Sequence, residues 1–435
     1  MPQNGPATEK NGWLEASGLP YIIRTFRMAI HPTRLLSVLA ALLLTLLWGW
    51  VLDRIWVQAG KGVGAEALDR YVAARQIDQE LEPAAGDLGI FEVWRTHERR
   101  CLLGLLGSSV PFTSTWAGGS PVGTYVRDFT GPATPLGSVV GMLYGVLWMA
   151  REHYFYFLLF GVGTLLIWSF GGGSVCRSAA LQFTRDERLG MGAAAQYVSQ
   201  RWLGGFFLAP LLPIIFVLVI GLLMVIGGMV LRIPVFGDIV AGGAFVLAVI
   251  GGFAAALLLL GLLAGGSLLW PTVAAEGSDA FDAFSRSLSY VLSRPWKTVL
   301  YACITLVYGS LCWLFVQLLT FVSLKFAHIV VGWGTSFFGA TSNKIERIWP
   351  ISGVHALHTW PDWSTLSWYE YISAFLIGIT VLIVVALMWA FLVSFYLSAS
   401  TIIYFLLRRD VDRIDLEDVY LEEEVPQTPA PPEAT

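Results

Sequence analysis

The stretch that decides the fold is Leu203–Leu231, LGGFFLAPLLPIIFVLVIGLLMVIGGMVL, which contains no Asp, Glu, Lys, Arg or His. A helix needs about 20 apolar residues to cross a hydrocarbon core ~30 Å thick, so this stretch can span a bilayer. The sequence predicts an all-α, polytopic bundle of six transmembrane helices, because five further stretches are also charge-free and long enough. They are Leu35–Leu52, Tyr154–Phe170, Ile239–Leu269, Val299–Leu324 and Ile372–Leu407.

The composition agrees with a chain that is surrounded by lipid. Of its 435 residues, 56% are hydrophobic and only 13% are charged, whereas a soluble domain carries about 25% charged residues. The net charge of -4 gives no basis for nucleic-acid binding. The sequence contains no P-loop, nucleophile elbow or haem-attachment motif, and its four cysteines form no Cys-x-x-Cys pair. We therefore expect neither a cofactor nor a nucleic-acid partner.

The placement of Lys and Arg predicts the orientation of the spans. The segments before the first, third and fifth spans and after the sixth are rich in Arg, whereas the loop between the third and fourth spans carries Arg232 alone. Short cytoplasmic segments carry an excess of positive residues. Because the number of spans is even, both termini are expected in the cytoplasm. The polar start of the chain has no cleavage site, so the first span should act as an uncleaved signal anchor.

The spans divide the chain into three hairpins with a tail. In the first outer loop, residues 139–150 are apolar but too short to cross, and they are expected to be re-entrant, interfacial or an outward extension of the second span. The predicted units are 1–34, the N-terminus with an interfacial helix; 35–170, the first hairpin with a long outer loop at 53–138; 171–270, the second hairpin with an interfacial helix at 190–202; 271–409, the third hairpin with an interfacial helix at 279–294 and an outer loop at 325–371; and 410–435, an acidic, Pro-rich disordered tail.

A short amphipathic segment precedes each odd-numbered span. Before the fifth span, apolar residues recur every three or four positions, while Asp282 and Arg286 form an i,i+4 pair on the opposite face, and Ser278 or Asp279 can cap the helix. Such helices should lie flat at the cytoplasmic interface, with the apolar face in the acyl boundary. The similar lead-ins predict one unit repeated three times, although any membrane hairpin has Arg and small residues at its ends. The interfacial residues are Arg201, Trp202, Arg286, Arg294 and Trp296.

One candidate metal site lies in the third outer loop. His355 and His358 are three residues apart and can share one face of a helix, with Asp362 as a third ligand. No Glu stands between the two histidines, and Pro350 and Pro361 would keep a helix here short. The alternative is a polar loop anchored by an aromatic belt at the membrane interface, and we expect no bound metal.

Two further features mark candidate packing and cavity positions. Gly261 and Gly265 form a small-xxx-small pair, which is typical of close helix packing in lipid. Pro210 and Pro213 are expected to kink the third span, which either opens a cavity or serves packing alone. Charged groups within a span would mark a functional path, but the pair formed by Arg151 and Glu152 precedes a full-length apolar stretch and is expected at the outer interface.

The segment Glu276–Trp296, EGSDAFDAFSRSLSYVLSRPW, resembles a group of bacterial six-span membrane proteins that carry an amphipathic Arg-Pro-Trp lead-in helix. This group includes the membrane domain found beside some glycerophosphodiester phosphodiesterases. The resemblance covers roughly residues 171–301 and 401–410, and it implies a location in the bacterial inner membrane. No phosphodiesterase catalytic domain is present, so that activity is not implied.

The absence of reactive motifs beside many packing and interfacial features predicts a non-enzymatic, structural or accessory membrane protein. Its expected partners are membrane lipids and either a protein partner or further copies of the same chain. The alternative is a transporter or channel for a neutral or lipidic substrate, using a Gly/Pro-lined cavity between the repeats.

Overall fold

The structure is a computed structural model, and it describes residues 18–63, 88–108, 135–234, 236–336, 344–350 and 361–421. These residues are helical, apart from connecting turns and one isolated β-bridge between Val63 and Leu88. A π-helical turn (Trp202–Phe207) and a 3-10 turn (Trp363–Thr365) join the α-helices. The α-helices are α2 (Leu19–Ile23), α3 (Thr25–Ala29), α4 (Pro32–Gln58), α6 (Ile90–Ser108), α7 (Pro135–Glu152), α8 (Tyr154–Arg185), α9 (Met191–Arg201), α10 (Leu208–Val230), α11 (Phe236–Glu276), α12 (Ala280–Ser293), α13 (Pro295–Ser336), α14 (Lys344–Ile348) and α15 (Trp368–Asp412).

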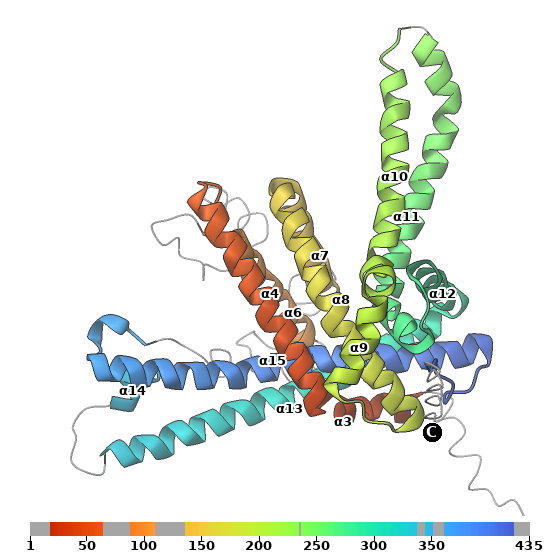
Figure 1. Ribbon diagram of the computed structural model, residues 1–435. Coiled ribbons are helices and arrows are strands. Elements are labelled where there is room, and N and C mark those ends of the chain that lie inside the picture. Colours follow the sequence, from red (N-terminus) through yellow and green to blue (C-terminus); the bar gives the residue numbers. More distant parts are fainter. Residues whose placement is uncertain are drawn as a thin grey trace, which may run out of the picture.

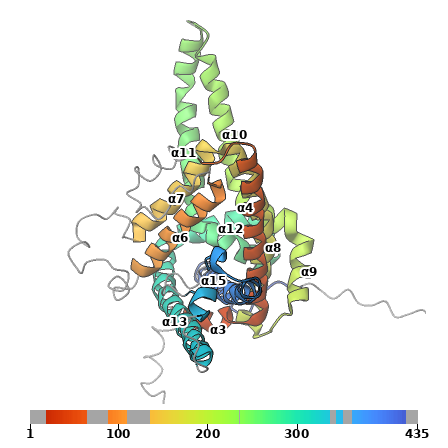
Figure 2. The same ribbon diagram turned by 90° about the vertical axis from the view of Figure 1, so that its left-hand side faces the viewer.

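Six stretches of helix in the described part of the chain are long and apolar enough to cross a membrane, in agreement with the prediction of a polytopic membrane protein. They belong to α4, α8, α9 with α10, α11, α13 and α15. The helix α4 packs against α8, α10 against α11, and α13 against α15. These three pairs diverge from a common region beside α3, α9 and α12, and the α10–α11 pair projects far from the rest (Figures 1 and 2).

We call the region where the pairs meet the base. It comprises Gly171–Arg185 of α8, Leu268–Glu276 of α11, Ala390–Asp412 of α15, the short helices α2, α3, α9 and α12, and residues 413–421. The ends of α8, α11 and α15 contact one another there. We call Ile214–Val230 of α10 together with Ile239–Leu260 of α11 the second arm.

Three consecutive glycines let other elements approach α8 at the start of the base. A Cβ on Gly171 would lie 2.9 Å from the Ala41 side chain of α4, one on Gly172 would lie 2.7 Å from the Trp270 ring of α11, and one on Gly173 would lie 2.8 Å from the Phe206 ring. Each glycine therefore admits a different neighbour. Beyond them, α8 stays buried through Leu181, and α15 stays buried from Ser398 through Leu407. The base therefore contains the longest runs of buried residues in the described helices.

The helix α7 includes residues 139–150 and folds back beside α8. It ends at Glu152, and His153 leaves helical geometry with φ -134° and ψ 50° before α8 begins. Met149 and Thr164 line the same groove although they are 15 positions apart, which a straight extension of α8 would prevent. The outward-extension alternative is therefore wrong. The helix α7 also packs against α6, which reaches α13 and places Leu106 in a cluster with Trp313.

The predicted disorder of the tail is wrong for residues 410–421. Asp410–Asp412 complete α15, and Tyr420 N–H donates to the Ala275 carbonyl at 2.8 Å. Val419 is 5% exposed. Composition alone misses these contacts, because a backbone hydrogen bond to another helix and the packing of the single residue Val419 into an apolar cluster need no apolar run in the tail. Residues 422–435 lie outside the described part of the chain.

The apolar face of α12 packs against other helices of the protein. The sequence predicted that this face would enter lipid. Ala283, Phe284 and Ser287 are buried, and α12 packs against α11 and α10. Gly261 and Gly265 lie directly beneath it: a Cβ on Gly261 would lie 2.6 Å from Leu288, and Ser287 Oγ donates to the Gly265 carbonyl at 2.6 Å. The close approach of two helices at these glycines explains why this face of α12 is not free for lipid.

Candidate functional site

A buried ionic cluster joins three elements of the base. The Glu276 carboxylate at the end of α11 lies 3.0 Å from Arg408 Nε of α15 and 2.5 Å from Arg286 Nη1 of α12. It also accepts from the Tyr404 hydroxyl at 2.5 Å. Arg408 in turn lies 3.2 Å from the Asp418 carboxylate. The side chains of Glu276 and Arg408 are 10% and 9% exposed, so each charge depends on the other for compensation.

The start of α12 shows how this cluster is positioned. The Asp279 carboxylate caps the helix by accepting from the Asp282 N–H at 2.9 Å, and Arg286 Nε donates to Asp282 at 2.9 Å, as the spacing predicted. The Asp282 hydrogen bond, followed by the Glu276 and Asp282 charges, raises the pKa of Arg286 above its ordinary value. Arg286 is therefore held charged between two carboxylates.

Arg177 forms a second connection, through neutral acceptors. Its guanidinium donates to the Ala274 carbonyl at 2.8 Å and to the Tyr420 carbonyl at 2.9 Å. It also lies 3.9 Å from the centre of the Tyr197 ring, where a cation–π interaction is favourable. Arg201 approaches the same ring from 4.6 Å and donates to the Tyr420 hydroxyl at 3.3 Å. Arg177 and Arg201 thereby fasten residues 413–421 onto α8, α9 and α11.

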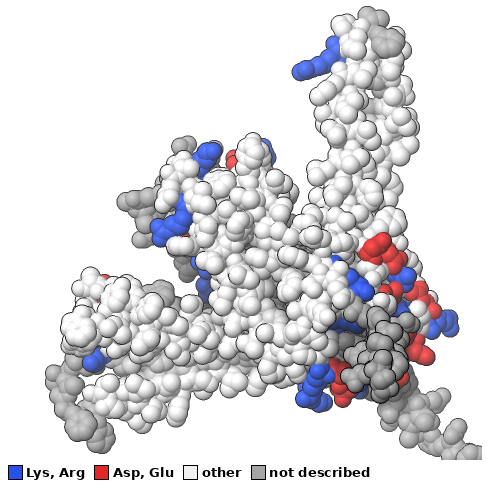
Figure 3. Space-filling model, viewed as in Figure 1, with Lys and Arg blue, Asp and Glu red and all other residues white. Residues whose placement is uncertain are grey.

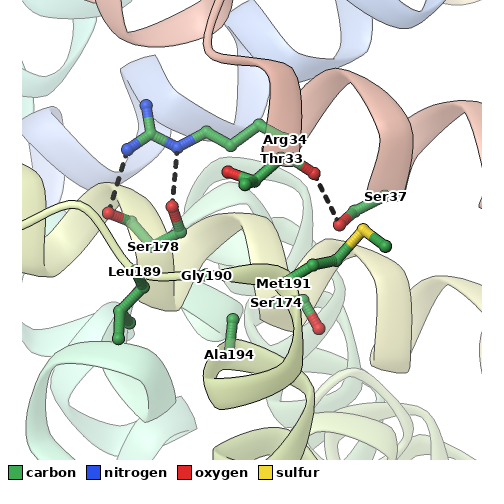
Figure 4. Close-up of a pocket in the computed structure, with 9 residues that line it drawn as sticks. All are labelled: Thr33, Arg34, Ser37, Ser174, Ser178, Leu189, Gly190, Met191 and Ala194. Carbon is green, nitrogen blue, oxygen red and sulfur yellow. Dashed lines mark hydrogen bonds between the residues drawn. The ribbon is translucent and has the colours of Figure 1, made fainter.

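Arg34 lines a small pocket (Figure 4). It is 1% exposed and donates to the Ser178 hydroxyl and carbonyl, to Gln182 Oε1 and to the Met28 carbonyl. The pocket holds about 10 Å³, which is room for roughly one water. It is too small for a ligand, so Arg34 joins α4 to α8 rather than forming a binding site.

A larger groove lies between the first and second pairs. Its volume is about 360 Å³, and its walls come from α6, α7, α8 and α11. The lining is almost entirely apolar, and half of the lining residues are aromatic: Trp94, Phe157, Phe160, Trp168 and Trp270. The volume falls within the range of about 300–1,000 Å³ that small-molecule sites occupy.

The candidate residues from the sequence lie apart from this groove. Arg201 and Arg286 belong to the base, and Trp202 opens the π-helical turn next to it, where Trp202 Nε1 donates to Ser169 Oγ at 2.7 Å. Arg294 at the end of α12 and Trp296 at the start of α13 are exposed, with Trp296 85% exposed. Arg151 and Glu152 form an exposed pair at 3.9 Å. Neither Arg151, Glu152, Pro210 nor Pro213 lines the groove or the Arg34 pocket.

The prolines of α10 follow the π-helical turn at Trp202–Phe207. Pro210 has no N–H to donate to the Phe206 carbonyl. Trp270 Nε1 of α11 donates to that carbonyl at 2.9 Å instead. The proline therefore serves the packing of α10 on α11 at this point.

The predicted metal ligands are only partly within the described residues. His355 and His358 lie outside them. Asp362 caps the 3-10 turn by accepting from the Ser364 hydroxyl at 2.7 Å and from its N–H at 3.1 Å, which lowers the pKa of Asp362. Within the part of the chain that the structure describes, no three His, Cys, Asp or Glu side chains are grouped to hold a metal.

The sequence reasoning missed the roles of Glu276, Arg177, Arg34 and Arg408. Each was visible only as a charge next to a span. One pattern could have indicated that Arg177 and Arg34 are buried. Each stands next to a run of small or apolar residues, and such runs pack closely. Comparison of the chain with models of protein families, with curated proteins and with solved structures gives no match.

Proposed function

We propose that this polytopic membrane protein is a non-enzymatic accessory component whose second arm associates with another membrane protein or with a second copy of the chain. The main support is the contrast between the base and the second arm. Along the second arm the large side chains are exposed, including Leu222 at 61%, Leu247 at 70% and Phe253 at 67%. The α10–α11 pair packs against α8, α12 and α15, and its far part projects away from the other described helices (Figure 1).

The glycines of the second arm support this proposal. Gly221, Gly227, Gly228, Gly242, Gly243 and Gly252 have no neighbouring atom within 4 Å of a Cβ position. Glycine in a helix costs about 1 kcal/mol relative to alanine. Within the α10–α11 pair, these glycines do not allow any closer contact that would offset this cost. Small residues on a helix surface do, however, let the backbone of another helix approach closely in lipid.

The divergence of the pairs adds a geometric argument. Six apolar helices that share one bilayer lie roughly along its normal, with tilts of about 20° on average. The three pairs instead splay from the base (Figures 1 and 2). In the membrane, either the pairs move together or other molecules fill the space between them. A partner protein would fill that space.

We further propose that the base faces the cytoplasm of a bacterial cell and that both termini lie there. A large group of charged side chains of both signs surrounds the base, while others lie at the far ends of the helix pairs (Figure 3). Among them are Arg24, Arg27, Arg185, Arg188 and Arg201, as the positive-inside rule requires of the cytoplasmic face. The polar groups of the cluster around Glu276 bind one another, which supports a structural rather than a catalytic role.

Site-specific photo-crosslinking in native membranes tests the proposed function. A photoreactive residue at Leu222 of the second arm should give a discrete protein adduct that mass spectrometry identifies. The matched control is Leu158 of α8, which is 64% exposed and should give lipid adducts alone. Gly252→Leu should weaken the Leu222 adduct. If both positions yield lipid adducts only, the accessory role is wrong.

The groove favours a second candidate function, transport of a lipidic substrate. Its walls are aromatic rather than Gly/Pro-lined, although it does lie between two pairs as such a path would require. Reconstitution with a fluorescent phospholipid in the inner leaflet would reveal transport as accelerated access to an external reductant. A rate equal to that of protein-free vesicles would eliminate this candidate.

A further inference from the structure

The short helices α2 and α3 turn a face of mixed apolar and cationic side chains away from the protein. Ile23 and Ile30 are 50% and 44% exposed, and Arg24 and Arg27 are exposed between them. Arg24 keeps helical geometry where it joins α2 to α3, so these four residues share one side of the joined helices. The opposite side is buried at Ile22, Thr25, Met28 and Ala29. Apolar and basic side chains on one exposed face are typical of a helix at a membrane interface.

The level of this face in the membrane follows from the start of the first span. The helix α4 begins at Pro32, and it is long and apolar enough to cross a bilayer. Its charge-free stretch begins at Leu35, less than two helical turns after Ile30. The exposed face of α2 and α3 therefore lies close to the boundary between the hydrocarbon core and the lipid headgroups.

A further exposed cation joins this face from the segment after α8. The rings of Tyr21 in α2 and Phe183 in α8 meet edge to face, with centres 5.9 Å apart, so the end of α8 lies beside α2. Burial, followed by the charges of Arg34 and Arg188, lowers the pKa of His31. Arg188 is thus close enough to the end of α3 to act on His31. The buried Arg34 adds positive charge beneath, because all of its acceptors are neutral.

The described part of the chain supplies no anion to these exposed cations. None of its carboxylates forms an ion pair with Arg24, Arg27 or Arg188. Asp186 and Glu187 are exposed in the segment just before Arg188, and they form no ion pair with it. The three exposed guanidinium groups are therefore available to anions from outside the protein.

The α12 side of the base differs in this respect. Asp and Glu side chains gather there (Figure 3). Arg286 is paired with Glu276 and Asp282, and Lys297 Nζ lies 2.7 Å from the Asp410 carboxylate. On the α12 side the protein provides the counter-charges, whereas on the α2–α3 side they must come from the surroundings.

We propose that Arg24, Arg27 and Arg188 bind the phosphates of anionic phospholipids, with Ile23 and Ile30 among the upper parts of the acyl chains. A guanidinium group binds phosphate through two parallel hydrogen bonds, and basic clusters next to a span are attracted to anionic lipid surfaces. This inference rests on the proposed position of the base at the membrane surface and not on the partner of the second arm. Crosslinking from Leu222 should therefore be the same whether or not these lipids bind.

Lipid titration of the purified full-length protein tests the proposal. Phosphatidylglycerol or zwitterionic phosphatidylcholine is added in detergent, and native mass spectrometry gives the dissociation constant of the first bound lipid. The wild type should prefer phosphatidylglycerol. Combined Arg24→Gln, Arg27→Gln and Arg188→Gln should weaken phosphatidylglycerol binding about tenfold or more and leave phosphatidylcholine binding unchanged. The same three changes to Lys should keep most of the affinity, because the charges remain.

The matched control removes three exposed cations elsewhere, with Arg151→Gln, Arg232→Gln and Arg294→Gln. It changes the net charge equally and should leave phosphatidylglycerol binding unchanged. Inorganic phosphate at the same concentration should not displace the lipid, because it cannot contact Ile23 and Ile30. No preference for phosphatidylglycerol in the wild type, equal losses in the two Gln variants, or displacement by inorganic phosphate would each overturn the proposal.

Discussion

The base and the second arm are built on opposite principles. In the base, Glu276, Arg408 and Arg177 are buried and reach charged or carbonyl partners on other helices. In the second arm, large apolar side chains and open glycines face away from the chain. The comparison teaches that this chain specifies the geometry of its base with its own side chains, whereas the surroundings of the second arm come from the membrane and its other occupants.

The largest effect is expected from Glu276→Ala. The substitution leaves Arg408 buried without its Glu276 partner, and removing one member of a buried ion pair costs about 3–5 kcal/mol. The midpoint of thermal unfolding in detergent, followed by tryptophan fluorescence, should fall steeply. Glu152→Ala is the control, because the Glu152 side chain is 60% exposed in its pair with Arg151, and its midpoint should not move. A small shift for Glu276→Ala would contradict the account of the base.

A chain that ends at Asp412 should be the next most affected. It loses the hydrogen bonds that Tyr420 makes with Ala275 and Arg177, and the Arg408–Asp418 ion pair. At about 1 kcal/mol for each hydrogen bond, the free energy of unfolding should drop by roughly 2–3 kcal/mol. A chain ending at Leu421 keeps all of these contacts and serves as the control in chemical unfolding. Equal stability of the two truncated chains would show that the contacts contribute nothing.

A smaller loss is expected from Gly265→Val beneath α12. Its Cβ would lie 2.8 Å from Ser287 Oγ, and overpacking of this kind costs about 1–3 kcal/mol. Gly252→Val, on the second arm, should leave the stability of the purified protein unchanged while reducing crosslinking from Leu222. Thermal unfolding separates the two variants, and a destabilised Gly252→Val would mean that the second arm has packing of its own.

A prediction of a different kind concerns pH. Because the pKa of Glu98 rises to about 8 in the folded protein from an ordinary value of 4.5, the unfolded chain releases this proton first. The contribution of Glu98 to stability should therefore be greatest below pH 4.5, decline as pH rises toward 8 and level off above it. Glu98→Gln should flatten this part of the profile. Unfolding midpoints measured from pH 5 to 9 give the comparison, and identical slopes for both proteins would argue against a buried Glu98.

The sequence predicts the apolar spans well, because the absence of charge over 17 or more residues has one main physical meaning. It also predicts the Asp279 cap and the Asp282–Arg286 pair, which depend on spacing within one helix. It leaves open whether residues 139–150 fold back beside α8, and it does not predict that Tyr420 binds Ala275. These contacts join residues far apart in sequence through backbone groups and ring faces, for which no residue pattern is specific.

The most direct test of the contrast is a pair of spin-label distance measurements in lipid nanodiscs, with the native cysteines replaced. Labels at Arg185 and Leu292 report on the base, and labels at Leu222 and Phe326 report on the second arm relative to α13. The account predicts one narrow distance distribution for the base and a broad one for the arm in lipid alone. A single narrow distribution between Leu222 and Phe326 in lipid alone would contradict it, because the chain would then fix its arms without any other molecule.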